Sequence, residues 1–300
     1  MKNVNPKFLL IGGSGMIGYN FLKIMINNKI NFEYTYNKNP IPYDKKGYFL
    51  DITDKKGTID FIAQINPNYI IHTAAISNAD FCETNTNYAD LVNVTGTENV
   101  VEACKKTASK IIFISSSYVF DGKKDEYFEN DPTSPTTYYG VTKEKSEKLI
   151  QNSDIDFLIL RTDQPYCWTE KWQRSNSVMR VIQSLKSSNI FKEIIDWYSN
   201  PTYVPNFVDI TLELIKTNSS GIYHLTGPDF ICRYEWSLLV CEIFNLNKKL
   251  LIPIKSNELN LSVKRKKIKM NSQKIFKELG INTMGIHEGL ETMFKTKNTK

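Results

Sequence analysis

Apolar and polar residues form two kinds of segment along the first half of the chain. Short apolar runs, typical of buried strands, occupy residues 8–11, 32–36, 69–72, 111–115 and 157–160. Stretches with apolar residues at helical spacing fall among them, at residues 16–26, 56–65, 88–107 and 138–151. Alternating strands and helices predict an α/β fold, with a parallel sheet covered by helices on both faces.

A glycine-rich turn joins the first predicted strand to the first predicted helix. It reads Gly12-Gly13-Ser14-Gly15-Met16-Ile17-Gly18. Glycines let backbone amides approach a pyrophosphate closely, and a helix N-terminus favours its negative charge. Strand, glycine turn and helix in this order predict a Rossmann-type, doubly wound sheet that binds a dinucleotide. The expected cofactor contacts in this turn are Gly12, Ser14, Gly15, Met16, Ile17 and Gly18.

The end of the second predicted strand bears on the choice of cofactor. NAD-selective folds place an acid there, to bind the ribose 2′-hydroxyl. This chain reads Tyr36-Asn37-Lys38-Asn39, without an acid. Lys38 offers a point charge to a 2′-phosphate. We therefore expect Asn37 and Lys38 to contact NADP(H), with NAD(H) as the alternative.

The alternation loosens after Arg161. Residues 162–205 are rich in Trp, Tyr, Asn and Ser, and helix or strand patterns return only at 207–216, 221–225, 233–244 and 272–279. We predict a nucleotide-binding domain over residues 1–162, to which residues 203–225 return. Residues 163–202 and 226–300 would form a smaller, C-terminal substrate-binding region.

Composition narrows the class of protein. Of the 300 residues 41% are apolar, enough for a normal core. The five cysteines form no C-x-x-C pair, and the three histidines are widely spread, so we expect reduced thiols, a cytoplasmic location and no metal site. No apolar run is long enough to cross a membrane, and the N-terminus lacks a signal-peptide pattern.

A net charge of +6 leaves three uses open for the basic cluster at residues 264–269. A solvated surface segment is the interpretation we favour, and contact with a substrate diphosphate comes second. Nucleic-acid binding comes third, because no aromatic residues are interleaved with the charges. We expect no nucleic-acid partner.

Tyr139 and Lys143 have the spacing of two groups on one helix face. A nearby ammonium favours the tyrosinate and should lower the phenol pKa from its usual value of about 10. Such a tyrosine can give a proton to a carbonyl that receives a hydride. Ser116 ends the strand at 111–115, where side chains face the ligand crevice, and its hydroxyl could orient that carbonyl.

Together these motifs resemble an extended short-chain dehydrogenase/reductase, and within it the dTDP-4-dehydrorhamnose reductase subgroup. The resemblance covers nearly the whole chain. It is carried by Gly12-x-x-Gly15-x-x-Gly18, Leu50–Asp54, Ile71–Ala75, Ser115–Gly122, Tyr139–Lys143, Leu160–Thr162, Pro201–Tyr203, Gly221–Gly227 and Arg233–Glu235.

The resemblance implies NADPH-dependent reduction of a 4-keto-6-deoxy nucleotide sugar. Ser116 would be the catalytic hydroxyl, Tyr139 the acid and Lys143 its partner, and the last two would also contact the cofactor. Asp51 and Ile52 would line the adenine. Ala74 and Ala75 would pass along the cofactor.

The chain departs from the subgroup near the expected sugar site. It has Ser116-Ser117 where Thr-Asp is usual, and Asp163-Gln164-Pro165-Tyr166-Cys167 where the subgroup has Ser-Trp-Val-Tyr-Gly. Trp168 and Trp172 could compensate for the missing tryptophan by stacking. The expected substrate contacts are Ser117, Gln164, Tyr166, Trp168 and Arg233.

Two other functions stay open. The first is an epimerase or reductase acting on a different nucleotide sugar. The second is a non-catalytic NADP-binding subunit like the regulatory β subunit of methionine adenosyltransferase. A homodimer is compatible with the sequence.

Overall fold

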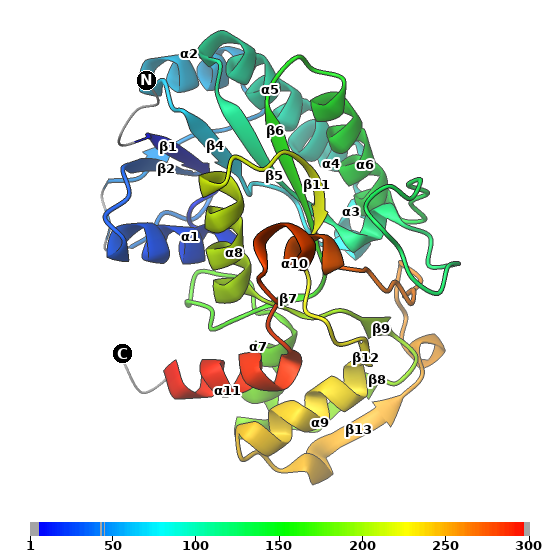
Figure 1. The fold of residues 1–300 in the computed structure, drawn as a ribbon. Coiled ribbons are helices and arrows are strands. Elements are labelled where there is room, and N and C mark those ends of the chain that lie inside the picture. The colour runs from blue at the N-terminus through cyan, green and yellow to red at the C-terminus, as the bar shows by residue number, and fades with distance from the viewer. Residues whose placement is uncertain (1–5, 43, 45, 297–300) are drawn as a thin grey trace.

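The computed structural model describes residues 6–42, 44 and 46–296, and the outermost ends of both predicted domains lie outside them. A parallel seven-stranded sheet forms its centre, in the order β11-β6-β5-β4-β1-β2-β3 (Figure 1). Its strands are β1 (Phe8–Ile11), β2 (Phe32–Tyr36), β3 (Tyr48–Phe49), β4 (Tyr69–His72), β5 (Lys110–Ser116), β6 (Phe157–Thr162) and β11 (Gly221–His224). Strands β1 and β5 are buried along their whole length, which explains their continuous apolar runs.

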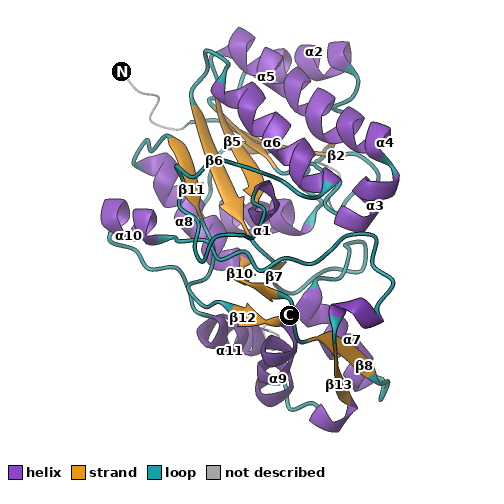
Figure 2. Ribbon diagram, turned by 90° about the vertical axis from the view of Figure 1, so that its right-hand side faces the viewer, coloured by secondary structure: helices purple, strands orange, loops and turns teal. Residues whose placement is uncertain are grey.

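Helices cover both faces of this sheet (Figure 2). One face carries α1 (Met16–Asn27) and α8 (Val204–Lys216), which pack against each other. The other carries α2 (Lys55–Ile65), α5 (Gly96–Thr107) and α6 (Tyr138–Gln151). Beside α6 lie α3 (Ala79–Thr84) and α4 (Thr86–Asp90), and α10 (Gln273–Leu279) contacts the edge strand β11. We call the sheet and these helices the large lobe.

A small lobe lies beyond the carboxyl ends of the strands, in the lower half of Figure 1. It contains α7 (Ser177–Lys186), α9 (Arg233–Ile243) and α11 (Ile286–Thr296). Short strand pairs complete it: β7 (Pro165–Tyr166) with β10 (Thr202–Tyr203), β8 (Phe191–Ile194) with β13 (Leu251–Ile254), and β9 (Tyr198–Ser199) with β12 (Ile231–Cys232). A cleft can therefore form between the lobes, at the edge of the sheet where parallel strands end.

The expected α/β fold is confirmed, and the predicted strands agree with β1, β2, β4, β5, β6 and β11 to within two residues at each end. The helix predicted at 88–107 is instead α4, a turn of π-helix at Leu91–Thr95 and α5. Helix α7 was not predicted, although Asn176 caps its N-terminus by accepting a hydrogen bond from Met179 N at 3.1 Å. Its short apolar face packs against α9 and against the strands β7 and β8 of the small lobe.

Two absences hold for the described part of the chain. None of its helices combines the length and apolarity needed to cross a bilayer. Likewise, none of its His, Cys, Asp and Glu side chains gather in threes that could hold a metal ion.

Candidate functional site

A cleft of about 830 Å³ runs between the two lobes, within the size range of small-molecule sites. Its large-lobe wall contains every predicted cofactor residue and the predicted catalytic serine. These residues are Gly12, Ser14, Gly15, Met16, Ile17, Gly18, Asn37, Lys38, Asp51, Ile52, Ala74, Ala75, Ser116, Tyr139 and Lys143. Residues far apart in the sequence thus share one wall.

The glycine turn has the shape of a phosphate cradle. Gly12 has φ +85°, and a Cβ on it would lie 2.9 Å from Ala74 N. A Cβ on Gly18 would collide with the Gly12 carbonyl, so side chains at these positions would close the turn. Helix α1 has no side-chain cap at Gly15, which leaves its first amides available to a ligand. These features fit the pyrophosphate of a dinucleotide.

The end of β2 lies at the same wall. The Lys38 side chain is exposed, and its Nζ lies 5.6 Å from the centre of the Tyr88 ring. Asp51 Oδ1 accepts hydrogen bonds from Thr53 N at 3.0 Å and Thr53 Oγ1 at 2.7 Å, which fix this loop. Lys38 is therefore an exposed cation at the edge of the cleft.

Helix α6 brings Tyr139 beside the end of β5. Thr137 caps the helix by accepting a hydrogen bond from Gly140 N at 3.1 Å. A Cβ on Gly140 would collide with the Tyr118 carbonyl, so glycine allows the helix to approach the chain just after β5. Ser116, Tyr139 and Lys143 are all buried and line the cleft together.

The π-turn before α5 fixes helix α6 in place. Asn93, within that turn, donates from Nδ2 to Thr142 Oγ1 at 3.0 Å and accepts from Ile76 N at 2.8 Å. Thr142 lies between Tyr139 and Lys143 on α6. Single π-turns are common at functional sites. Here the π-turn carries Asn93, the side chain that holds helix α6.

The charge states of the pair differ from the sequence expectation. Burial raises the pKa of the Tyr139 phenol above its ordinary value, Cys82 adds to the rise, and a hydrogen bond with the Ser116 hydroxyl opposes it. Burial also lowers the pKa of Lys143 to about 8, against the attraction of Glu147. Lys143 Nζ lies 6.0 Å from the Tyr139 ring centre and donates to Ile114 O at 2.8 Å. The expected lowering of the tyrosine pKa is thus wrong here, because burial raises the pKa of Tyr139 instead.

Two predicted substrate residues line the small-lobe side of the cleft, Gln164 and Arg233. Arg233 Nη1 donates to Gln164 Oε1 at 2.9 Å, and Nη2 pairs with Glu193 at 3.1 Å. The guanidinium also stacks on Trp197, 4.9 Å from the ring centre. Arg233 is therefore fixed in position by its partners on three sides.

The other three predicted substrate residues do not line the cleft. Ser117 is buried, and its Oγ donates to Asp163 Oδ1 at 2.8 Å. Tyr166 is fully buried against Tyr203 and Trp236. Trp168 packs edge-on to Phe244. The expectation that they contact the sugar is corrected: Tyr166 and Trp168 pack against aromatic side chains of the small lobe, and Ser117 is bound to Asp163.

Trp172, which could have stacked on the sugar, contacts the glycine turn instead. Its Nε1 donates to Ser14 O at 3.3 Å, and Gln173 Nε2 donates to the same oxygen at 3.0 Å. Asn39, just after β2, donates to Trp172 O at 3.4 Å. The loop carrying Trp172 thus spans from the small lobe to the glycine turn.

Asp163 lines the cleft, although it was not among the expected substrate contacts. Its carboxylate accepts hydrogen bonds from Ser117 Oγ at 2.8 Å and Asn200 N at 3.0 Å. Burial raises the pKa of Asp163 to about 7, and these hydrogen bonds and Arg233 oppose the rise. Its position in the departure from the subgroup pattern was the only signal in the sequence.

The arginines carried a signal that the sequence-based expectations used only in part, at Arg233 and in the basic cluster. Five of the 38 basic residues are arginines. Four of them line the cleft: Arg174, Arg180, Arg233 and Arg265. The fifth, Arg161, forms a buried pair with Glu147 at 2.7 Å.

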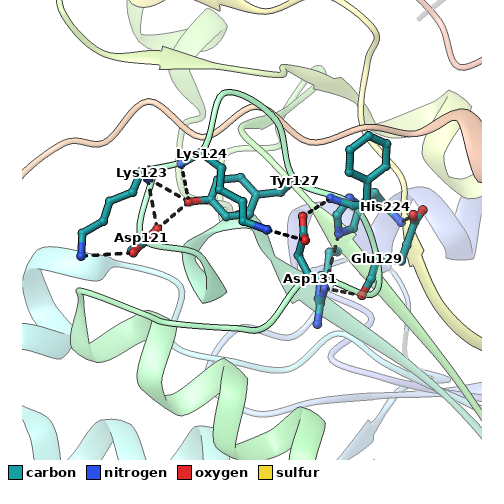
Figure 3. Close-up of polar contacts among 9 residues, drawn as sticks. Asp121, Lys123, Lys124, Tyr127, Glu129, Asp131 and His224 are labelled. Atoms are coloured by element: carbon teal, nitrogen blue, oxygen red, sulfur yellow. Dashed lines mark hydrogen bonds and ion pairs between the residues drawn. The ribbon is translucent and has the colours of Figure 1, made fainter.

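Asp121, within the family motif Ser115–Gly122, stabilises the loop that follows β5. Asp121 accepts hydrogen bonds from Lys123 N at 3.1 Å and from Tyr127 Oη at 2.5 Å (Figure 3). In the same loop Glu129 Oε1 accepts from His224 N at 3.0 Å, which ties the loop to β11. These contacts order the loop after β5, and Asp121 does not line the cleft.

Comparison with known families now adds to this geometry. The family described as "RmlD substrate binding domain" matches residues 6–299. The chain belongs to this family. The resemblance found in the motifs, to the dTDP-4-dehydrorhamnose reductase-like branch of the extended short-chain dehydrogenases/reductases, is confirmed.

Individual relatives are of two kinds. A dTDP-4-dehydrorhamnose reductase of Aggregatibacter actinomycetemcomitans is 28% identical over 241 residues, 78% of each chain. A methionine adenosyltransferase 2 subunit beta of Xenopus tropicalis is 29% identical over 212 residues, 69% of this chain and 63% of its own length. Among solved structures, the Bacillus anthracis dTDP-4-dehydrorhamnose reductase in complex with NADP has a TM-score of 0.87 at 24% identity, covering 98% of this chain and all of that one. That likeness shows a shared fold.

Proposed function

We propose that this protein is an oxidoreductase that uses NADPH to reduce the 4-keto group of a nucleotide-linked 6-deoxysugar. One observation carries the proposal: Ser116, Tyr139 and Lys143 line the same cleft as the glycine turn. The confirmed family and its reductase members support the same chemistry. The NADP complex of a protein with this fold supports the choice of cofactor.

In this proposal bound NADPH supplies the hydride to the carbonyl carbon. Tyr139 donates its phenolic proton to the carbonyl oxygen, which completes the hydroxyl. The Ser116 hydroxyl, hydrogen-bonded to Tyr139, orients that oxygen. The Lys143 ammonium stabilises the tyrosinate that remains. Burial of all three groups excludes water and strengthens these interactions.

A regulatory subunit without turnover is a second candidate, because a methionine adenosyltransferase beta subunit is among the relatives. The intact Ser116, Tyr139 and Lys143 support the enzyme instead. An epimerase on another nucleotide sugar would use the same groups without net consumption of NADPH.

The test is NADPH oxidation, followed by absorbance, with a panel of 4-keto sugars linked to dTDP, UDP or GDP. We expect turnover with at least one of them. Product analysis would separate reduction from epimerisation. NADP binding without turnover on the whole panel would refute the reductase and favour the regulatory subunit.

A further inference from the structure

Asp163 is a buried acid of the cleft that the mechanism above does not use. It is only 5% exposed. Both of its carboxylate oxygens accept a hydrogen bond, Oδ1 from Ser117 Oγ at 2.8 Å and Oδ2 from Asn200 N at 3.0 Å. A buried carboxylate costs free energy unless such bonds compensate it. Buried acids with shifted pKa values in a cleft are typical of functional sites.

The first partner of Asp163 belongs to a turn that holds the proposed catalytic groups. This single turn of 3-10 helix, Ser117–Val119, begins directly after Ser116. Tyr118 N donates to Ser116 Oγ at 3.3 Å, so the turn locates the Ser116 hydroxyl. The Tyr118 ring also packs edge-on against the Tyr139 ring, with 5.8 Å between their centres. An anchor on this turn therefore fixes Ser116 and Tyr139 relative to each other.

The second partner, Asn200, connects Asp163 to more distant segments. Asn200 is 1% exposed. Its Nδ2 donates to Gly227 O at 3.3 Å and to Asp229 O at 3.1 Å, and its Oδ1 accepts from Met270 N at 2.9 Å. One side of the Asp163 carboxylate is thus held firmly, which allows the other side to hold the turn after β5.

These contacts fit the ionised form of Asp163. A carboxylate accepts at both oxygens, whereas a carboxylic acid carries a hydrogen on one of them. Asn200 N can only donate, so a hydrogen on Oδ2 would break that bond. A hydrogen on Oδ1 would require the Ser117 hydroxyl to turn round. Protonation therefore disturbs one end of the anchor or the other.

The electrostatic surroundings make this protonation accessible near neutral pH. Burial raises the pKa of Asp163 to about 7, and its hydrogen bonds and the charge of Arg233 oppose the rise. Tyr118 also interacts with the Asp163 charge, but it is neutral, because burial raises the pKa of its phenol to about 12.

Ser117 and Asp163 both lie where the chain departs from the subgroup pattern. The subgroup has an acid at the position of Ser117 and a serine at the position of Asp163. The two side chains contact each other, so this chain keeps a carboxylate–hydroxyl pair and exchanges its members. The exchange moves the charge from the turn after β5 to the segment after β6.

We propose that Asp163, in its ionised form, is a positioning residue for the reduction, because it anchors the turn Ser117–Val119 and thereby aligns Ser116 with Tyr139. This inference rests on the proposed function for the reaction itself. Tyr139 remains the proton donor, and Asp163 acts only through its hydrogen bond to Ser117.

Kinetics of three variants at pH 8, with a titration of NADP for each, test the proposal. Asp163→Ser should lower kcat by about tenfold, the effect of one lost hydrogen bond, and leave the Kd for NADP near the wild-type value. Ser117→Ala should lower kcat by a smaller factor. The exchange variant Ser117→Asp/Asp163→Ser restores a carboxylate–hydroxyl pair and should recover most of kcat.

Asp196 provides a matched control. Its carboxylate accepts from Ser256 N and from Ser256 Oγ, both at 2.9 Å, and it does not line the cleft. Asp196→Ser should change kcat little. In the wild type, kcat should fall as the pH drops below about 7, since Asp163 is then protonated. This acid limb should persist in Asp196→Ser and be absent from Asp163→Ser.

Several outcomes would overturn the inference. Wild-type kcat in Asp163→Ser would show that the turn needs no such anchor, and where this variant does not fold, wild-type kcat in Ser117→Ala shows the same. A loss that the exchange variant does not recover, or an acid limb that persists in Asp163→Ser, would leave Asp163 a structural residue. A wild type that turns over no keto sugar refutes the proposed function and this inference with it. Equal turnover by the wild type and the variants refutes the inference alone.

Discussion

The two walls of the cleft are built in opposite ways. The large-lobe wall takes its glycine turn from seven consecutive residues, Gly12–Gly18, and the proposed catalytic pair, Tyr139 and Lys143, from one helix turn. The small-lobe wall combines Gln164, Arg233 and Arg265, which are separated by dozens of residues in the chain. A cradle of consecutive residues is encoded locally, whereas a wall of distant residues depends on how the small lobe packs.

This difference indicates where the effect of a substitution can be predicted from the local sequence. On the large-lobe wall, a side chain near the cleft is held by its own helix or turn. On the small-lobe wall, neighbouring residues in sequence divide between cleft and core, as Gln164 and Tyr166 do. The predictions below test this contrast, from the largest expected effect to the smallest.

Tyr139→Phe should lower kcat by about 10²- to 10⁴-fold, the usual contribution of a general acid. The aromatic ring is retained in the variant, so the Kd for NADPH should be unchanged. Steady-state kinetics and a binding titration measure the two quantities. A variant that keeps most of its kcat would remove Tyr139 from the chemistry.

Trp168→Ala should lower the free energy of unfolding by about 3 kcal/mol, because it empties space beside Phe244. The indole also loses the hydrogen bond from Nε1 to Met293 O at 2.6 Å. Trp172→Ala is the matched control, and there we expect a raised Kd for NADP with a smaller stability loss. Denaturant unfolding and cofactor titration check the pair. If Trp168→Ala instead raises only the KM for the sugar, the residue faces the cleft after all.

The alkaline side of the pH profile should report Lys143. Its pKa of about 8 means that the ammonium form predominates below that pH and is lost above it. Since the ammonium stabilises the tyrosinate, kcat/KM should fall about tenfold per pH unit above that pKa. Lys143→Arg keeps its charge, so it should show a lower rate without this limb. An unchanged limb in Lys143→Arg would assign the titration to another group.

Lys38→Asp should shift the cofactor preference toward NADH by about tenfold, since an acid binds the ribose 2′-hydroxyl and repels a 2′-phosphate. The ratio of kcat/KM for the two cofactors measures it. Lys29, in the exposed turn after α1, provides a control substitution of equal charge. A ratio that does not move would place the 2′-phosphate elsewhere, with Arg174 as the next residue to test.

The same contrast between local and distant contacts explains which features could be predicted from the sequence. The strands at 8–11, 32–36 and 69–72 follow directly from their apolar runs, and the glycine turn from its spacing. Helices α7 and α11 were not predicted, because their apolar faces are recognisable only together with the elements that they pack against. The pKa direction of Tyr139 was wrong for a similar reason, since spacing shows a nearby lysine but not burial.

The sequence by itself indicated the individual strands, the glycine turn and the spacing of Tyr139 and Lys143, since each of these patterns lies within a few residues of chain. Only the tertiary structure decided that Tyr166 belongs to the core, that Trp168 packs against it, and that Arg265 lines the cleft. Those outcomes depend on which side chain fills the remaining volume between packed elements. That competition is settled between residues remote in sequence, so no local pattern records it.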